Sequence, residues 1–127
     1  MTVSALARNA YDQSTRSTAN PRAVERQLLA RLTSAIIVTE KKRDEDLSSF
    51  IQALSKNLEF WTVVATDVVG EGNKLPSELR AQLFYLFEFT RKHTNKILNQ
   101  DHQLSAEPLI EINQNILRGL QGQPEPA

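Results

Sequence analysis

Few residues of this 127-residue chain have the types and spacing that catalysis or metal binding requires. The chain contains no cysteine, which excludes disulfides, thiolate metal sites and cysteine nucleophiles. The two histidines, His93 and His102, have no acidic residue or second histidine four positions later, so a metal site would have to be assembled from distant segments. The many carboxylates follow an exposed pattern and form no acid and base pair. We therefore expect no enzyme activity, no metal and no cofactor.

Three further polar features have structural interpretations. Gly70 and Gly72 connect two expected helices and follow no strand, so they are interpreted as a plain turn rather than a phosphate-binding loop. His93 points toward a packed face, where it needs a hydrogen-bonded partner. Asn113 lies within an apolar stripe, and a buried unpaired amide costs roughly 1 to 3 kcal/mol. We expect Asn113 to bind a neighbouring helix end, and a role in packing specificity is the alternative.

The side chains best suited to a function are apolar ones that lie outside the core stripes of their helices. Such residues are covered either by the N-terminal arm and the last helix of the same chain, or by an amphipathic helix of another protein. If another protein covers them, aromatic anchors carry most of the binding affinity. Phe60, Phe84, Tyr85 and Phe89 are the first candidates. With the N-terminal tyrosine, the partner-binding candidates are Tyr11, Leu29, Ile37, Phe60, Val63, Phe84, Tyr85 and Phe89.

These candidates need helices to position them, and the hydrophobic periodicity predicts four. A helix from Asn20 and Pro21 to about Lys42 buries a stripe that includes Leu28, Leu32, Ala35 and Ile36. The next runs from Leu47 to Gly70, and another from Pro76 or Ser77 to Asn99 with Leu79, Leu83, Leu86, Thr90, Thr94 and Ile97 aligned. Pro108 starts the last helix, on which Leu109, Ile112, Ile116 and Leu120 face the core.

Four amphipathic helices with short connections predict an all-α fold, an antiparallel helical bundle. An extended coiled coil is the alternative, but only the third segment approaches the required spacing. We expect a single helical domain over residues 1–120, in which residues 1–19 form a short helical arm, and a disordered tail over residues 121–127.

Composition limits the location and the partners. Hydrophobic residues make up 40% of the chain and charged residues 24%, which is typical of a globular protein. The N-terminus lacks the apolar centre of a signal peptide, and no apolar run is long enough for membrane insertion, so a cytoplasmic location is expected. The segment up to Arg43 has eight basic and three acidic residues, and the remainder has seven and twelve. The basic first part of the chain either attracts an acidic partner or pairs with the acidic remainder of the same chain.

Several segments together resemble the FlaF family, the flagellar biosynthesis proteins of alphaproteobacteria. The strongest likeness is in LPSELRAQLFYLFEFTRKHTNKIL and PLIEINQNILRGL. AYDQSTRSTANPRAVERQLLARLTSAI is similar to the family's opening, and LEFWTVVATDV to its tryptophan-bearing helix. The resemblance extends from about Tyr11 to Leu120.

The resemblance implies a flagellin-binding secretion chaperone that is also a positive regulator of flagellin synthesis. The implied partners are the amphipathic terminal helices of flagellin and the regulator FlbT. The alternative is a post-transcriptional regulator that acts on flagellin mRNA, alone or with FlbT, but RNA is less favoured because basic residues are interleaved with acidic ones and no RNA-binding module is present. A structural subunit of the flagellar base is a third hypothesis.

Overall fold

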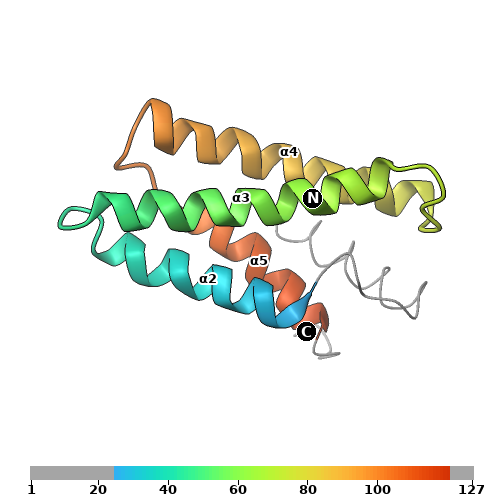
Figure 1. Cartoon of the computed structure of the whole chain (residues 1–127), viewed down its shortest axis with the longest axis horizontal. Coiled ribbons are helices and arrows are strands. Elements are labelled where there is room, and N and C mark those ends of the chain that lie inside the picture. Colours follow the sequence, from blue (N-terminus) through green and yellow to red (C-terminus); the bar gives the residue numbers. More distant parts are fainter. Residues whose placement is uncertain (1–24, 121–127) are drawn as a thin grey trace, which may run out of the picture.

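The computed structural model describes residues 25–120 of the chain. The regular structure of this part consists of α2 (Arg26–Lys41), α3 (Leu47–Val69), α4 (Ser77–Asn99) and α5 (Glu107–Leu120). Consecutive helices run in opposite directions and are joined by short turns (Figure 1), which confirms the predicted all-α bundle. The predicted arm over residues 1–19, with Tyr11, and the predicted tail over residues 121–127 lie outside the described residues.

The start of α2 differs from the sequence prediction. α2 begins at Arg26, because the preceding Glu25 has an extended backbone with φ −91° and ψ 115°. The predicted start at Asn20 and Pro21 lies outside the described residues. The Glu25 carboxylate accepts a hydrogen bond of 3.2 Å from the backbone N–H of Gln27, which satisfies one of the free donors at the helix start. A side-chain cap at residue 25 therefore sets this end of α2.

The predicted limits of the other helices are confirmed. Asp46 caps α3 by accepting a hydrogen bond from the backbone N–H of Ser49, and Gly70 ends this helix. The six residues predicted to align on α4 are its buried residues: Leu79, Leu83, Leu86, Thr90, Thr94 and Ile97. The turn between α3 and α4 has Gly72 at φ +85°, a conformation that glycine adopts without strain.

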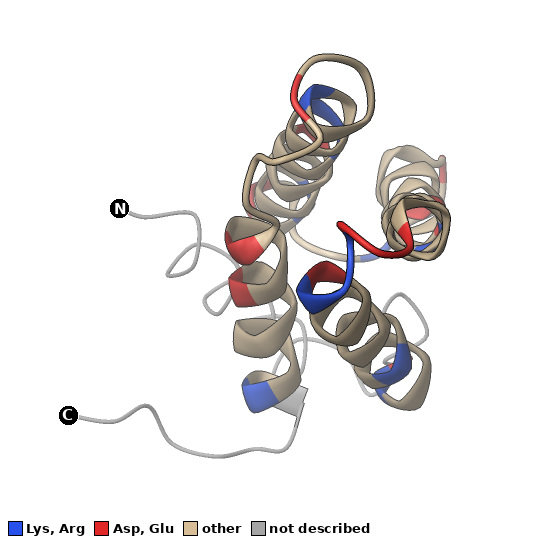
Figure 2. Ribbon diagram, turned by 90° about the vertical axis from the view of Figure 1, so that its left-hand side faces the viewer, with Lys and Arg blue, Asp and Glu red and all other residues tan. Residues whose placement is uncertain are grey.

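The four helices surround one elongated core. α3 packs against both α2 and α4, while α5 packs against α2 and touches α4 more lightly. Figure 2, which looks along the helices, shows α5 across the core from α3. One end of the core is built around Trp61, Leu83 and Ile112, and the other around Phe50, Ile97 and Leu109. The stripe predicted for α2 is partly wrong, because Ala35 is exposed whereas Ile36 is fully buried.

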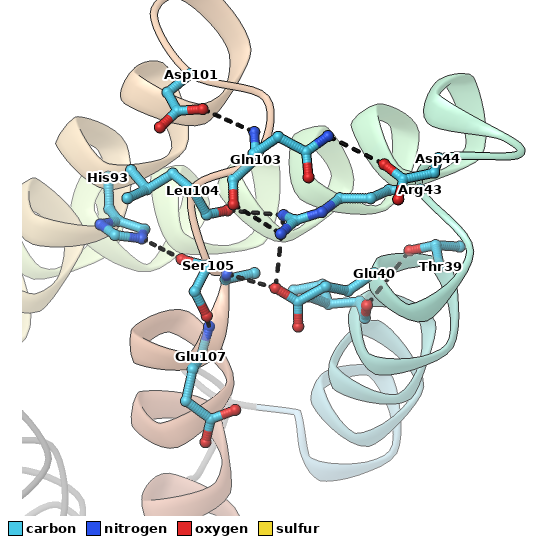
Figure 3. Close-up of polar contacts among 12 residues, drawn as sticks. Thr39, Glu40, Arg43, Asp44, His93, Asp101, Gln103, Leu104, Ser105 and Glu107 are labelled. Atoms are coloured by element: carbon cyan, nitrogen blue, oxygen red, sulfur yellow. Dashed lines mark hydrogen bonds and ion pairs between the residues drawn. The ribbon is translucent and has the colours of Figure 1, made fainter.

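A group of polar contacts fastens the α4–α5 connection to the turn between α2 and α3 (Figure 3). The Arg43 guanidinium donates hydrogen bonds of 2.7 Å to the carbonyl oxygens of Leu104 and Gln103, and it lies 5.4 Å above the Phe50 ring. The Glu40 carboxylate accepts a hydrogen bond of 2.6 Å from the backbone N–H of Ala106, just before α5 begins. These contacts fix where α5 starts.

The partner expected for His93 is present. Its Nε2–H donates a hydrogen bond of 2.7 Å to the carbonyl oxygen of Ser105, so this half-buried histidine helps to hold the same connection (Figure 3).

The core contains a polar network that links α3 to α5. Asn113 is fully buried, and its Oδ1 accepts a hydrogen bond of 3.1 Å from the Trp61 indole N–H. Its Nδ2 donates a hydrogen bond of 2.8 Å to Oδ1 of Asn57, which is also fully buried. The expectation that Asn113 binds a helix end is therefore wrong, because the side chains of α3 that face it supply both partners.

Candidate functional site

Two of the predicted partner-binding residues belong to the core. Leu29 is fully buried, because α2 packs against both α3 and α5 and therefore buries a wider arc than one stripe. Phe60 is only 9% exposed and meets the Trp61 ring edge-on, with centroids 6.0 Å apart. The expectation that these two side chains lie outside the core is wrong, although Phe60 still lines a surface groove.

Ile37 and Phe89 occupy intermediate positions. Ile37 is half-buried against the Phe50 end of the core. Phe89 is half-buried, contacts both ends of the core, and stacks on the His93 ring at a centroid distance of 5.8 Å. Both residues therefore stabilise the fold, and only the outer edge of Phe89 is available to a partner.

Phe84 and Tyr85 are exposed, as predicted. Phe84 is 37% exposed and Tyr85 is 49% exposed, and both lie on the outer side of α4. Together with four other residues they line a shallow hollow of about 430 Å³, which we call the α4 stripe: Ala81, Phe84, Tyr85, Glu88, Phe89 and Lys92. Its three aromatic residues are predicted from the sequence, whereas Ala81, Glu88 and Lys92 are not, because they contribute through their spacing along this face.

A charged pair lies beside the α4 stripe. Arg91 donates a hydrogen bond of 3.1 Å to the Glu88 carboxylate. This bond keeps the pKa of Glu88 below its ordinary value, and partial desolvation opposes the effect. Glu88 is thus ionised at neutral pH, and it lies one helical turn before Lys92 on the same face of α4.

Val63 belongs to a second surface, between α2 and α3. It is 68% exposed and lines a mainly apolar groove of about 440 Å³, which we call the α2–α3 groove. Its lining residues are Glu25, Leu28, Leu32, Lys56, Glu59, Phe60, Val63 and Val64. Leu28 and Leu32 were predicted as core residues, and the groove arises because their outer edges stay uncovered by the described residues.

Residues 25–120 offer neither a metal site nor a membrane-spanning helix. No group of three or more histidine, aspartate or glutamate side chains in this range is placed to hold a metal ion. None of the helices in the same range has the length and apolar character needed to cross a membrane.

Comparison with known proteins supplies the family. The model of the family described as "Flagellar protein FlaF" matches residues 7–120, which include the four described helices. No curated protein and no solved structure matches the chain. The matched range covers most of the 127 residues and agrees with the resemblance seen in the sequence. The chain therefore belongs to the family of the flagellar protein FlaF.

Proposed function

We propose that this flagellar protein is a flagellin-binding secretion chaperone, and that it promotes flagellin synthesis by keeping the product in a form that can be exported. Family membership supports a flagellar role. The observation that carries the finer proposal is the α4 stripe, where two exposed aromatic side chains line one hollow on a helix face that the other described residues leave uncovered. The role is one of binding rather than catalysis.

The spacing of the α4 stripe suits an amphipathic helix. Its residues recur at three and four positions from Ala81 to Lys92, so they form one continuous row along α4. Ala81 allows a partner backbone to approach closely, while Phe84 and Tyr85 supply the large contact area typical of binding hot spots. The terminal segments of flagellin are amphipathic helices of this kind, and covering them would prevent premature polymerisation.

The exposed area predicts binding of moderate strength. Aromatic side chains of roughly 200 Å² each, exposed by 37% and 49%, contribute about 4 kcal/mol when covered. Association itself costs at least about 4 kcal/mol in lost translational and rotational freedom, so the remaining contacts must supply the net affinity. A micromolar complex would protect flagellin and still release it at the export apparatus.

The test is calorimetric titration of purified flagellin into the full-length protein. The variant Phe84→Asp/Tyr85→Asp should weaken binding at least tenfold, because it places two carboxylates where an apolar helix must dock. The matched control is Val38→Asp/Val69→Asp, which changes two exposed valines that are 53% and 62% exposed and lie outside the stripe. The control should bind flagellin like the unmodified protein. Far-UV circular dichroism checks that each variant keeps its helices.

Phe89→Asp is unsuitable for this purpose, because Phe89 contacts both ends of the core and its replacement would disturb the fold. Absence of a flagellin complex at micromolar concentration would reject the chaperone function. Equal weakening by both double variants would reject the α4 stripe as the binding surface.

The distribution of basic residues favours a protein client over flagellin mRNA. Arg26 and Arg31 lie near the start of α2, whereas Lys41 and Lys42 lie at its end, so these exposed charges form two separate groups (Figure 2). Arg43 is already engaged with carbonyl oxygens. RNA affinity that falls steeply with salt, in the absence of flagellin binding, would support the regulator hypothesis instead.

A further inference from the structure

The α2–α3 groove shares no residue with the α4 stripe, and its lining is mainly apolar. We infer that its occupant is the N-terminal segment of the same chain, residues 3–11, bound as a short amphipathic helix. This inference concerns a contact within one molecule and does not depend on flagellin.

Chain connectivity allows this segment to reach the groove. Glu25, the first described residue, is itself one of the lining residues, so the preceding 24 residues leave from the edge of the groove. The 13 residues between Tyr11 and Glu25 can span at most about 45 Å, which is enough to reach any point along it. A short tether also gives the segment a millimolar effective concentration at the groove, so weak contacts are sufficient.

The residue pattern of the segment complements the groove. Val3, Leu6, Ala7, Ala10 and Tyr11 follow the spacing of one helical face. A helix of about nine residues is marginal alone in water and gains stability by burying such a face. The groove offers the outer edges of Leu28, Leu32 and Phe60 as well as the exposed Val63.

Charge supports the same pairing. The groove is lined by two glutamates, Glu25 and Glu59, and by one lysine, Lys56. Residues 3–11 contain one arginine, Arg8, and no acidic residue. The segment therefore approaches a groove of opposite net charge, which favours docking at low ionic strength.

Paramagnetic relaxation measured by NMR on the full-length protein tests this contact. The absence of cysteine allows one nitroxide label to be attached at a single introduced cysteine. Lys56→Cys places the label at the rim of the α2–α3 groove, and Lys92→Cys is the matched control at the rim of the α4 stripe; both lysines are exposed. We expect strong loss of amide signal intensity at residues 3–11 with the label at position 56 and no loss with the label at position 92.

Two double variants examine the apolar face itself. Leu6→Asp/Tyr11→Asp should abolish the intensity loss, whereas Ala5→Asp/Asn9→Asp, on the opposite side of the expected helix, should leave it unchanged. The amide signals of α2 to α5 should stay in place in both variants, which shows that the bundle is intact.

Three results would overturn the inference. The first is no intensity loss from the label at position 56, and the second is a loss that persists in Leu6→Asp/Tyr11→Asp. The third is intensity loss in isotope-labelled, cysteine-free protein mixed with spin-labelled protein, because this would mean that the segment of a second copy fills the groove. None of these results bears on flagellin binding at the α4 stripe, so the two proposals fail separately.

Discussion

At the scale of single residues, the buried amide of Asn113 holds two helices in one relative position. It satisfies the Trp61 indole N–H and the side-chain Oδ1 of Asn57 simultaneously, deep in the core. The Asn57 Nδ2 has no hydrogen-bond partner among the described residues, so the two asparagines are not equivalent. A buried polar atom without a partner lowers the stability of the fold. The stability lost when a member of the network is replaced therefore depends on how many atoms the replacement leaves unpaired.

Asn113→Ala should destabilise the protein by about 3 kcal/mol, because it leaves both the Trp61 N–H and the Asn57 Oδ1 unpaired in the core. Asn57→Ala should cost only about half as much, since it leaves one unpaired atom and removes one that is already unpaired. Urea unfolding followed by Trp61 fluorescence measures both values. Equal losses would contradict the described network.

The cap of α3 should be sensitive to pH. Hydrogen bonds from the Ser49 hydroxyl and backbone N–H lower the pKa of Asp46, and slight desolvation opposes them. A carboxyl group with a lowered folded-state pKa stabilises the fold above its unfolded-state pKa and loses this effect as the pH falls through the folded-state value. Carbon-detected NMR titration should therefore show the Asp46 pKa below its ordinary value, and Ser49→Ala should raise it. An unchanged pKa in Ser49→Ala would exclude the cap as the cause.

At the scale of elements, the turn between α3 and α4 distinguishes its two glycines. Gly72 adopts φ +85°, which side chains other than hydrogen rarely allow, whereas Gly70 has φ −69°. A Cβ atom on Gly70 would lie 3.4 Å from the Asp67 carbonyl oxygen, an ordinary contact. Only Gly72 is therefore required by backbone geometry.

Gly72→Ala should destabilise the protein by about 1 kcal/mol, because alanine is strained at positive φ. Gly70→Ala serves as the matched control and should be neutral or stabilising by about 0.5 kcal/mol, since it restricts only the unfolded chain. Thermal unfolding of both variants measures the difference. A loss of the same size in both would show that the turn does not require the positive φ of residue 72.

At the scale of the whole molecule, the two ends of the core belong to one packing unit. α2, α3, α4 and α5 each contribute to both ends, and Phe89 contacts both. The Arg43 contacts join the two connections at one end of the bundle. No described helix can therefore detach from the bundle without exposing buried apolar residues at both ends of the core.

Unfolding in urea should accordingly be a single cooperative transition. Trp61 fluorescence reports on one end of the core, and far-UV circular dichroism reports on all helices, so their transition midpoints should coincide. Phe89→Ala should lower both midpoints equally, by an amount that corresponds to about 3 kcal/mol. Midpoints that separate in this variant would show that the two ends unfold independently.

From the sequence alone, the fold class, the four described helices and the buried face of α4 are all predicted. These features depend on local rules: hydrophobic spacing, helix caps and glycine turns act between residues that are near one another in the chain. The same rules found Phe84 and Tyr85, because aromatic residues on several sides of α4 exceed what one neighbouring helix can cover.

The tertiary structure decided which of the other apolar residues are buried. Leu29 and Phe60 are inside because α2 and α3 each pack against two neighbours, and the periodicity of one helix contains no information about the number of its neighbours. The partners of Asn113 were likewise set by a contact 52 to 56 residues away in the chain. The α2–α3 groove also appears only after packing, since two helices form it, whereas each sequence pattern belongs to one helix.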